Sequence, residues 1–453
     1  MEKKQNLSVV MLPWLAHGHI SPYLELAKRL SKRSFKIYLC STPINLTSIN
    51  KNLVHNYSIE LIEFEIPSQP DLPPHFHTTN RLPLHLHNSL ITAVAMASPT
   101  FSNLIKTLKP DILIYDFNQQ WSSTLAAALN IPSVQFITGS PIFFSHVIHR
   151  LKKPTEDFPY PALNLPGIYW NRKFLEMFKQ HKNVSSSNSV MGRPCGIMFM
   201  KSSFEEVERK YIEYGSELFG VKIVPTGPLI KDPEEDDDIE SEIMEWLNRK
   251  QISSTVFVSF GTENFLSREE IEEIAKGLEL SMVNFIWVLR FPFGEKISIE
   301  EALPIGFLER VNTESDRRLV IDKWVSQSRI LAHPSIGGFV SHCGWGSTTE
   351  AMAFGVPIVA IPMQLDQPLN ARLVNEVGVG VEVERDENGK FSGEEIAKLI
   401  RDVILGENGK NIRDKAVEMK GRMKIEGEDA IDGVVEELYK LHHKNVCINE
   451  ENN

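Results

Sequence analysis

The sequence has few cysteines, and none of them is spaced to bind a metal. Four cysteines occur in 453 residues, and they stand singly as Cys40, Cys195, Cys343 and Cys447. No C-x-x-C pair or zinc-finger spacing occurs. Reduced thiols in a cytoplasmic protein are therefore the simplest interpretation.

Long apolar runs and an excess of basic residues are also missing. No stretch reaches the roughly eighteen apolar residues that a membrane span needs. The short apolar run near the N-terminus holds Pro13 and lacks a signal-peptide cleavage site, so we expect a buried strand there. The formal net charge of −11 argues against a nucleic-acid binder, which would carry a basic stripe. An anionic ligand must be held by local groups, because the overall field repels it.

What the sequence does have is an alternation of short apolar runs with longer amphipathic stretches. The runs LSVVML, FKIYLC, DILIYD and SVQFIT predict buried strands in the first half. The runs STVFVSF, NFIWVLR, RLVIDKW, GGFVSHC and PIVAIP predict them in the second half. Such alternation indicates βαβ units and parallel sheets. We expect an α/β protein with two doubly wound, Rossmann-like domains facing a cleft, and ligands beyond the carboxyl ends of the strands.

Composition also suggests where the domains begin and end. The segment TGPLIKDPEEDDDIESE is rich in Gly, Pro and acidic residues, which is typical of a linker. We therefore expect an N-terminal domain at 1–225, an acidic linker at 226–253 and a C-terminal domain at 254–430. Residues 431–453 are expected to form a helix that packs back on the N-terminal domain and ends in a frayed tail.

The stretch SHCGWGSTTEAMAFGVP changes from an apolar strand to a helix. Gly344 and Gly346 allow backbone N–H groups to approach a ligand, and the free N–H groups of a helix start suit a phosphate. His342 can donate a further hydrogen bond, and Ser347 occupies an N-cap or first-turn position. Glu350 can cap the helix or accept hydrogen bonds from a sugar diol. A capping box beside a buried tryptophan is the structural alternative.

Neighbouring strand ends complete the inventory for a nucleotide sugar. Trp324 could stack on a flat base, and Gln327 could hydrogen-bond the edge of that base. Asp366 and Gln367 suit the hydroxyls of a sugar.

The range Trp324–Gln367 holds W-x-x-Q, H-x-x-x-G-G-F, H-C-G-W-x-S, E, G-V-P, P and D-Q in this order. It resembles the signature box of the plant family 1, UDP-sugar-dependent glycosyltransferases, and the similarity extends to FVSFGT and GHISP. The family implies the GT-B fold, inversion at the anomeric carbon and no metal. It also implies an acceptor site in the first domain and a UDP-sugar as co-substrate in the second.

The resemblance also assigns residues. Trp324, followed by Val325, is expected at the uracil, and Gln327 and Glu350 at the ribose. His342, Gly344, Trp345 and Ser347 are expected at the diphosphate, and Asp366 and Gln367 at the hexose. A final Gln favours UDP-glucose as the donor. Thr138 resembles a residue that touches the donor sugar, and Thr262 could hold a phosphate oxygen.

Two positions depart from the usual pattern of the box. Gly346 replaces an Asn and so removes one side-chain contact to phosphate, and Ile361 replaces a Trp. These departures resemble the branch that adds sugars to sugars already attached to a small molecule. We therefore expect transfer from UDP-glucose to a small-molecule glycoside, such as that of a flavonoid or terpenoid. Direct transfer to an aglycone, or use of another UDP-sugar such as UDP-xylose, is the alternative. No nucleic acid and no membrane insertion is expected.

Two residues at predicted strand ends suit general base catalysis. Attack on an anomeric carbon needs a base for the acceptor hydroxyl, and histidine has a suitable pKa. His19 stands at the exit of the first strand, where the family match also puts the base, whereas His17 is interpreted as a wall residue. Asp116 ends the strand DILIYD and could fix the tautomer of His19. Helix capping is the structural alternative for both.

Other ligand sites and activities find less support. The acidic run Glu234–Asp238 could bind a metal through D-x-D, but a solvated linker is the preferred interpretation. The pairs His75/His77 and His85/His87 lack a carboxylate or cysteine that would complete a metal site. The sequence LAHGHI is not the G-x-G-x-x-G of a dehydrogenase. A non-catalytic binder is disfavoured because His19 and Asp116 are both present.

Overall fold

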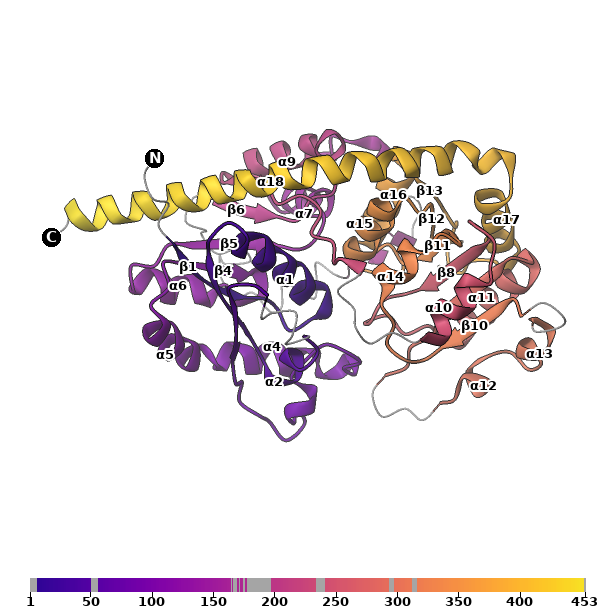
Figure 1. Ribbon diagram of the computed structural model, residues 1–453, viewed down its shortest axis with the longest axis horizontal. Helices are drawn as coiled ribbons and strands as arrows, with labels where there is room; N and C mark the ends of the chain where they lie inside the picture. The colour runs from indigo at the N-terminus through magenta and orange to yellow at the C-terminus, as the bar shows by residue number, and fades with distance from the viewer. Residues whose placement is uncertain are drawn as a thin grey trace. The chain divides into compact units, whose positions relative to one another are not determined.

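The computed structural model describes residues 6–49, 56–163, 165, 169–170, 172–173, 176, 197–233, 241–292, 297–311 and 316–451 (Figure 1). The chain divides into two compact units. Unit 1 comprises residues 1–152, 185–229 and 425–453, and unit 2 comprises residues 153–184 and 230–424. Each unit holds one parallel sheet with helices, which confirms the predicted α/β class with two Rossmann-like domains.

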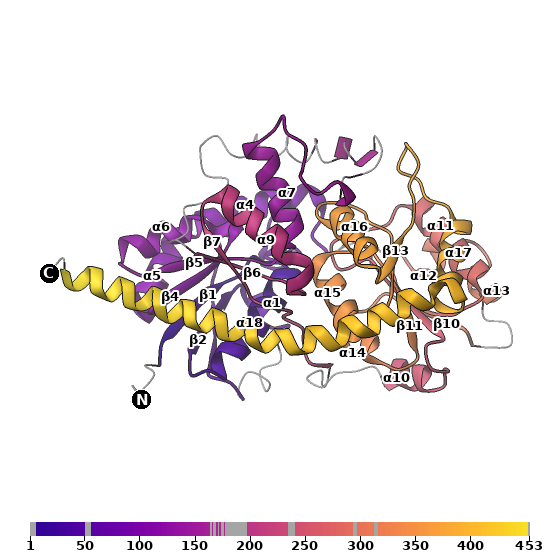
Figure 2. The same cartoon turned by 90° about the horizontal axis from the view of Figure 1, so that it is seen from above.

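Unit 1 is built on a seven-stranded parallel sheet in the order β3-β2-β1-β4-β5-β6-β7 (Figure 2). Its strands are rich in β-branched and other apolar residues because both faces are covered. The strands are β1 (Ser8–Leu12), β2 (Lys36–Ser41), β3 (Ile59–Glu63), β4 (Ile112–Asp116), β5 (Ser133–Ile137), β6 (Ile197–Met200) and β7 (Lys222–Pro225). The helices are α1 (His17–Ser31), α2 (Pro43–Leu46), α4 (His87–Met96), α5 (Ser98–Leu108), α6 (Trp121–Ala128), α7 (Pro141–Lys152) and α9 (Glu205–Phe219). Short 3₁₀ turns are η1 (Pro74–Phe76), η2 (Leu84–Leu86) and η3 (Phe117–Gln119).

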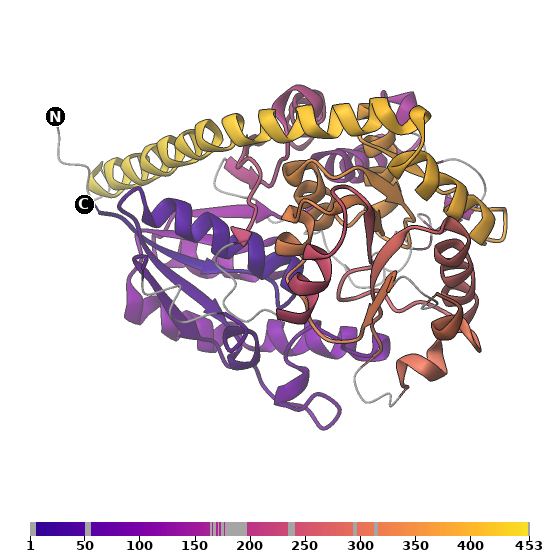
Figure 3. The same cartoon turned by 45° about the vertical axis from the view of Figure 1, so that its right-hand side comes forward.

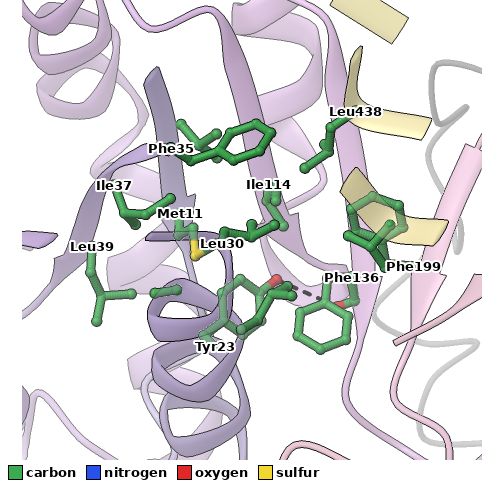
Figure 4. Packing of buried hydrophobic residues seen from close by; sticks show 14 of the residues in the cluster. Met11, Tyr23, Leu30, Phe35, Ile37, Leu39, Ile114, Phe136, Phe199 and Leu438 are labelled. Atoms are coloured by element: carbon green, nitrogen blue, oxygen red, sulfur yellow. Dashed lines mark hydrogen bonds between the residues drawn. The ribbon is translucent and has the colours of Figure 1, made fainter. Parts of the chain in front are cut away.

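The core of unit 1 joins the central strands to α1 (Figure 4). Along α1, Tyr23 and Leu30 are one pair of a buried stripe with helical spacing. They pack with Met11 of β1 and Ile114 of β4. Tyr23 Oη also donates a hydrogen bond of 3.4 Å to the carbonyl of Phe136. This packing fixes the start of α1 beside the ends of β1 and β4.

Unit 2 is built on a six-stranded parallel sheet in the order β10-β9-β8-β11-β12-β13. The strands are β8 (Thr255–Ser259), β9 (Asn284–Val288), β10 (Arg318–Ile321), β11 (Ile336–Ser341), β12 (Ile358–Ala360) and β13 (Gly380–Glu382). The helices are α10 (Ser241–Asn248), α11 (Arg268–Ser281), α12 (Ile299–Ala302), α13 (Phe307–Val311), α14 (Gln327–Ala332), α15 (Trp345–Phe354), α16 (Gln367–Val377) and α17 (Gly393–Ile404). The 3₁₀ turns are η4 (Pro161–Leu163) and η6 (Glu407–Gly409).

A segment from the first half of the chain belongs to unit 2. Residues 153–184 lie inside the range 1–225 that the sequence suggests for the first domain, but the structure groups them with unit 2. Within this segment η4 contacts α16, and Tyr169 and Trp170 lie against the guanidinium of Arg385. These contacts, rather than position in the sequence, decide to which unit the segment belongs.

The last helix, α18 (Lys410–Glu451), is a single continuous helix (yellow in Figure 3). Its residues from Ile425 onward belong to unit 1, where Ile431, Val434 and Leu438 are buried in the core. Asn445 donates a hydrogen bond of 2.8 Å from Nδ2 to the carbonyl of Asn130. The helix continues to Glu451, so most of the tail that we expected to be frayed is helical.

Within the part of the chain that the structure describes, no helix combines the length and the apolar character needed to cross a membrane.

Two glycines allow α11 and α17 to cross closely. A Cβ atom on Gly277 would lie 2.7 Å from Cγ2 of Ile396, and one on Gly393 would lie 2.6 Å from the carbonyl oxygen of Glu273. Both distances are too short for real atoms, so the backbones of the two helices meet at these glycines.

We expect Gly277→Ala to destabilise the protein by about 1–3 kcal/mol, because the new methyl group overpacks this crossing. Gly421→Ala in α18 is the matched control, because nothing lies within 4 Å of its added Cβ. Alanine there should raise stability by about 0.4–1 kcal/mol. Urea unfolding measures both free energies, and a Gly277→Ala protein as stable as the Gly421→Ala protein contradicts the close crossing.

Candidate active site

In each unit the polar side chains gather where the strand order reverses. The unit 1 sheet reverses between β1 and β4, and the unit 2 sheet reverses between β8 and β11. Loops that leave two such strands diverge to opposite faces, which opens a crevice where ligands bind in this fold class. The predicted base and its partner flank the first reversal, and the predicted diphosphate residues flank the second.

His19 and Asp116 come together at the reversal in unit 1. The Nδ1 atom of His19 lies 2.7 Å from Oδ2 of Asp116. Asp116 is fully buried, whereas 23% of the His19 side chain is exposed. The imidazole is therefore anchored on one side and accessible on the other. The helix α1 begins at His17, so His19 lies in its first turn and does not precede the helix as the sequence suggested.

The contacts of Asp116 decide which ring nitrogen carries the proton. Its Oδ1 accepts a hydrogen bond of 3.3 Å from the backbone N–H of Asn118, as the N-cap of η3. The capping interpretation of Asp116 is thus correct for one oxygen, and the partnership with His19 is correct for the other. Because carboxylate oxygens accept hydrogen bonds, Nδ1 of His19 is the donor. The proton on Nδ1 leaves Nε2 with its lone pair, as a base requires.

Two further side chains surround this pair. Oγ1 of Thr138 lies 3.0 Å from Nδ1 of His19, so in this structure Thr138 supports the histidine. The ring of Phe117 lies 6.3 Å from the His19 ring between centroids, and 42% of Phe117 is exposed. His17 is exposed. The sequence analysis missed Phe117, although its place directly after Asp116 was a usable signal.

His342 is held at the reversal in unit 2 by two glycines. A Cβ atom on Gly261 would lie 2.9 Å from Nε2 of His342, and one on Gly344 would lie 2.6 Å from the same atom. His342 is only 7% exposed, and its burial lowers the pKa to about 4, despite a backbone contact with Ser259 that favours the charged form. The imidazole is therefore neutral near pH 7 and carries one N–H donor.

The helix α15 begins without a side-chain cap. Its N-cap is Gly344, and the first backbone bond inside it runs from Thr348 N–H to the Gly344 carbonyl at 2.9 Å. The N–H groups of residues 345–347 precede that bond, in the first turn, where a helix provides no intrahelical acceptor for them. Ser347 is the third residue of the helix, and the suggested capping box with Glu350 does not form. Trp345 is buried, as the structural alternative suggested.

Gln327 joins the helix start to the residues predicted for the ribose. From α14 its Nε2 donates to Oγ of Ser347 at 3.0 Å and to Oε2 of Glu350 at 2.7 Å. The Ser347 oxygen accepts this bond, so its own O–H can donate to a ligand. Trp324 is 47% exposed, with Lys231 Nζ 5.8 Å from the ring centroid, and Val325 beside it is buried.

The loop before α16 holds the two residues predicted for the hexose. Oε1 of Gln367 accepts backbone N–H groups from Met363 and Gln364, both at 2.9 Å. These two bonds fix the orientation of the amide and make Nε2 the group that can donate to a ligand. Oδ2 of Asp366 accepts a hydrogen bond of 2.8 Å from Asn370.

Two asparagines, which the sequence analysis missed, tie the loops of unit 2 together. Nδ2 of Asn370 donates to the carbonyl of Cys343 at 2.9 Å as well as to Asp366. It therefore links the loop before α16 to the turn that follows His342. Oδ1 of Asn264 accepts a hydrogen bond of 2.9 Å from Gln364, and its Nδ2 donates to the Phe260 carbonyl. This second link holds the loop after β8, where Thr262 is half-buried.

Within the described ranges, the histidine pairs of the sequence do not form a metal site. His77 is buried, and its Nε2 lies 3.2 Å from the carbonyl of Leu72. Among the described residues no three His, Cys, Asp or Glu side chains are grouped to hold a metal ion. The acidic run Glu234–Asp238 lies outside the described residues.

Comparison with known proteins identifies the family. Residues 224–416 match the family described as UDP-glucoronosyl and UDP-glucosyl transferase, and residues 5–231 match the glycosyltransferase N-terminal domain. A Gardenia jasminoides β-D-glucosyl crocetin β-1,6-glucosyltransferase is 49% identical over 95% of this chain and 98% of its own. A Citrus maxima flavanone 7-O-glucoside 2''-O-β-L-rhamnosyltransferase is 42% identical over 96% of this chain and 98% of its own.

Solved structures agree with the sequence matches. The Glycyrrhiza uralensis protein UGT73P12, complexed with glycyrrhetinic acid 3-O-monoglucuronide, superposes with a TM-score of 0.80 and 25% identity over 99% of both chains. With the two parallel sheets described above, this likeness establishes the GT-B fold. The chain therefore belongs to the plant family 1 UDP-glycosyltransferases, and it is a UDP-dependent glycosyltransferase.

Proposed function

We propose that this enzyme transfers glucose from UDP-glucose to a hydroxyl of a small-molecule glycoside, with inversion at the anomeric carbon. The observation that carries the proposal is the 2.7 Å contact between His19 and the buried Asp116. With the proton on Nδ1, the lone pair of Nε2 on this partly exposed histidine can take a proton from an alcohol. The sugar chain of a flavonoid, terpenoid or similar metabolite would be extended or branched in this way.

In the proposed reaction His19 removes the proton of the acceptor hydroxyl as its oxygen attacks the anomeric carbon. A new carbon–oxygen bond forms, and the bond from the anomeric carbon to the β-phosphate oxygen breaks. UDP leaves with the electron pair, and the proton resides on His19 Nε2. Asp116 stabilises the imidazolium that forms. Since there is one displacement, the configuration inverts.

The departing diphosphate is proposed to be held by neutral donors in unit 2. These are the first backbone N–H groups of α15, the N–H of His342 and the hydroxyl of Ser347. Preorganised donors of this kind stabilise a developing negative charge without any reorganisation at the moment of reaction. The partial positive charge at the helix start adds to their effect.

The remaining donor contacts follow from the same geometry. The exposed indole of Trp324 offers a face for the uracil, and Glu350, held by Gln327, offers carboxylate oxygens to the ribose diol. Asp366 and the Nε2 of Gln367 are proposed to bind the hexose hydroxyls. Glucose is favoured because the box ends in Gln, whereas the rhamnosyl transfer named for the Citrus relative keeps other UDP-sugars as the alternative.

A glycoside is favoured as the acceptor for two reasons. The Gardenia and Citrus relatives are both named for acting on glucosides. In addition, the exposed ring of Phe117 beside His19 offers an apolar face that suits the C–H face of a sugar. Direct transfer to an aglycone is the alternative.

We expect His19→Ala to lower kcat by about 1,000-fold or more while UDP affinity stays within about twofold, because only the base is removed. Asp116→Asn should lower kcat on the order of 10²- to 10⁴-fold, because the new amide can donate to Nδ1 of His19 and so reverse the tautomer. His17→Ala is the control, because this neighbour is exposed and lies in the same first turn of α1. Turnover assays measure kcat, and calorimetric titration with UDP measures its affinity. An active His19→Ala enzyme would contradict the assignment of His19 as the base.

We expect Gly344→Ala to weaken UDP binding at least about tenfold, or about 1.4 kcal/mol, because the new methyl displaces the His342 ring. Gly421→Ala in α18 should change it less than about twofold, since this glycine is outside the proposed site and nothing lies within 4 Å of its added Cβ. Calorimetry with UDP measures both constants. Equal losses in the two variants would show that His342 does not shape the diphosphate site.

The acceptor is tested by offering one flavonol or triterpene beside its monoglucoside, with UDP-glucose or UDP-xylose and mass detection. We expect the monoglucoside with UDP-glucose to react at least about tenfold faster than any other combination, a transition-state preference of about 1.4 kcal/mol. A preference for the aglycone would refute the acceptor proposal, and a preference for UDP-xylose would refute the donor proposal.

A further inference from the structure

Arg385 is a buried cation that lies behind the sugar end of the proposed donor site. It follows β13, and its side chain is only 4% exposed. Burying a guanidinium is costly unless its donors are satisfied, so its surroundings need an explanation. The nearest acidic oxygen in its ion pairs, Oε1 of Glu270, is 3.7 Å away, which is not a close ion pair.

The donors of Arg385 are directed to the backbone of the sugar loop. Nε and Nη2 donate to the carbonyl of Pro362 at 3.1 and 2.9 Å, and Nη2 also lies 3.0 Å from the sulfur of Met363. Nη1 donates to the carbonyl of Gly389. Such a two-pronged grip on one carbonyl needs the planar fork of arginine.

The contact continues from Pro362 to the predicted hexose residues. Met363, directly after Pro362, donates its backbone N–H to Oε1 of Gln367. Between them Leu365 has a φ of 53°, a left-handed conformation that a leucine adopts only when its surroundings impose it. Arg385 therefore contacts the Pro362 carbonyl, and the next residue, Met363, contacts the amide of Gln367 that we propose to bind the sugar.

Aromatic rings enclose the other side of Arg385. The guanidinium carbon lies 4.6 Å from the ring centroid of Phe391, 5.8 Å from that of Trp170 and 6.0 Å from that of Tyr169. Gly389 has a φ of +83°, and a Cβ there would lie 2.2 Å from the Tyr169 ring, so no larger residue fits. Tyr169 and Trp170 belong to the segment 153–184, so a segment from the first half of the sequence packs against Arg385 in unit 2.

We propose that Arg385, held by Tyr169 and Trp170, is a positioning residue that sets the affinity of the enzyme for the sugar half of its donor. It does so by fixing the loop 362–367, which carries Asp366 and Gln367. The inference rests on the proposed role of that loop in sugar binding. It does not concern the uridine and diphosphate groups, whose proposed contacts lie in α14 and α15 and in the loops that precede these helices.

The test compares UDP with UDP-glucose as ligands in calorimetry without acceptor. Arg385→Lys keeps the charge but cannot grip one carbonyl with two donors. We expect it to raise the Kd of UDP-glucose at least tenfold and to leave the Kd of UDP within twofold. The KM for acceptor should stay unchanged. Tyr169→Ala is a milder change at a half-buried ring. It should raise the ratio of the UDP-glucose Kd to the UDP Kd by about threefold.

A matched control separates positioning from a general loss of stability. Arg413 also donates to two backbone carbonyls in unit 2, those of Val403 and Gly406, at 2.7 and 3.1 Å. Arg413→Lys should leave the ratio of the two Kd values unchanged. The proposal is overturned if Arg385→Lys and Tyr169→Ala weaken the affinity for UDP and for UDP-glucose equally, or weaken neither affinity.

The outcome can be told apart from a failure of the proposed donor. If the wild-type enzyme prefers another UDP-sugar, the choice of glucose is wrong, and the same ratio is then measured with the preferred sugar. The positioning role is judged by the change between variant and wild type, so it stands or falls independently of which sugar is used.

Discussion

In the proposed mechanism, the chemistry of this enzyme depends on the hydrogen bond between His19 and Asp116. Asp116 is fully buried at the end of β4, and its second oxygen is occupied by the N–H of Asn118. The carboxylate therefore cannot turn away, and the histidine that it holds cannot change its tautomer without losing a buried partner. Packing of α1 against the central strands brings the two residues, 97 positions apart, within 2.7 Å. In the proposed mechanism, the fold supplies the base by fixing the proton on the opposite ring nitrogen.

The proposed donor site in unit 2 has to bind a negatively charged diphosphate, and it offers neutral groups for this purpose. The chain carries a net charge of −11, and the residues at the reversal of the unit 2 sheet include a histidine that burial keeps uncharged near pH 7. At the proposed donor site, a neutral imidazole and a helix start would attract a diphosphate less than a cluster of lysines would. The asparagines at 264 and 370 and the buried arginine at 385 hold the loops in register, because dipoles act only when they are correctly aimed.

The sequence predicted most of the strands of the two sheets, because buried parallel strands are continuous apolar runs. It did not reveal β3, where glutamates interrupt the run at a sheet edge. It also missed β6 and β7, which have four residues each, and β13, which has only three. Ser347 and Glu350 looked like a capping box, but the structure gives both to Gln327, since a tertiary partner overrides a local motif. The roles of Asn370, Arg385 and the segment 153–184 depend on contacts between residues far apart in sequence, and no local pattern encodes those.

The most direct measurement of the central claim is nitrogen NMR of ¹⁵N-histidine-labelled protein, with the His19 signals assigned by comparison with a His19→Gln variant. When the His19 imidazole is neutral, we predict that Nδ1 resonates as a protonated nitrogen and Nε2 as an unprotonated one. A proton found on Nε2 would leave the histidine without a lone pair for the acceptor, and it would contradict the proposed mechanism.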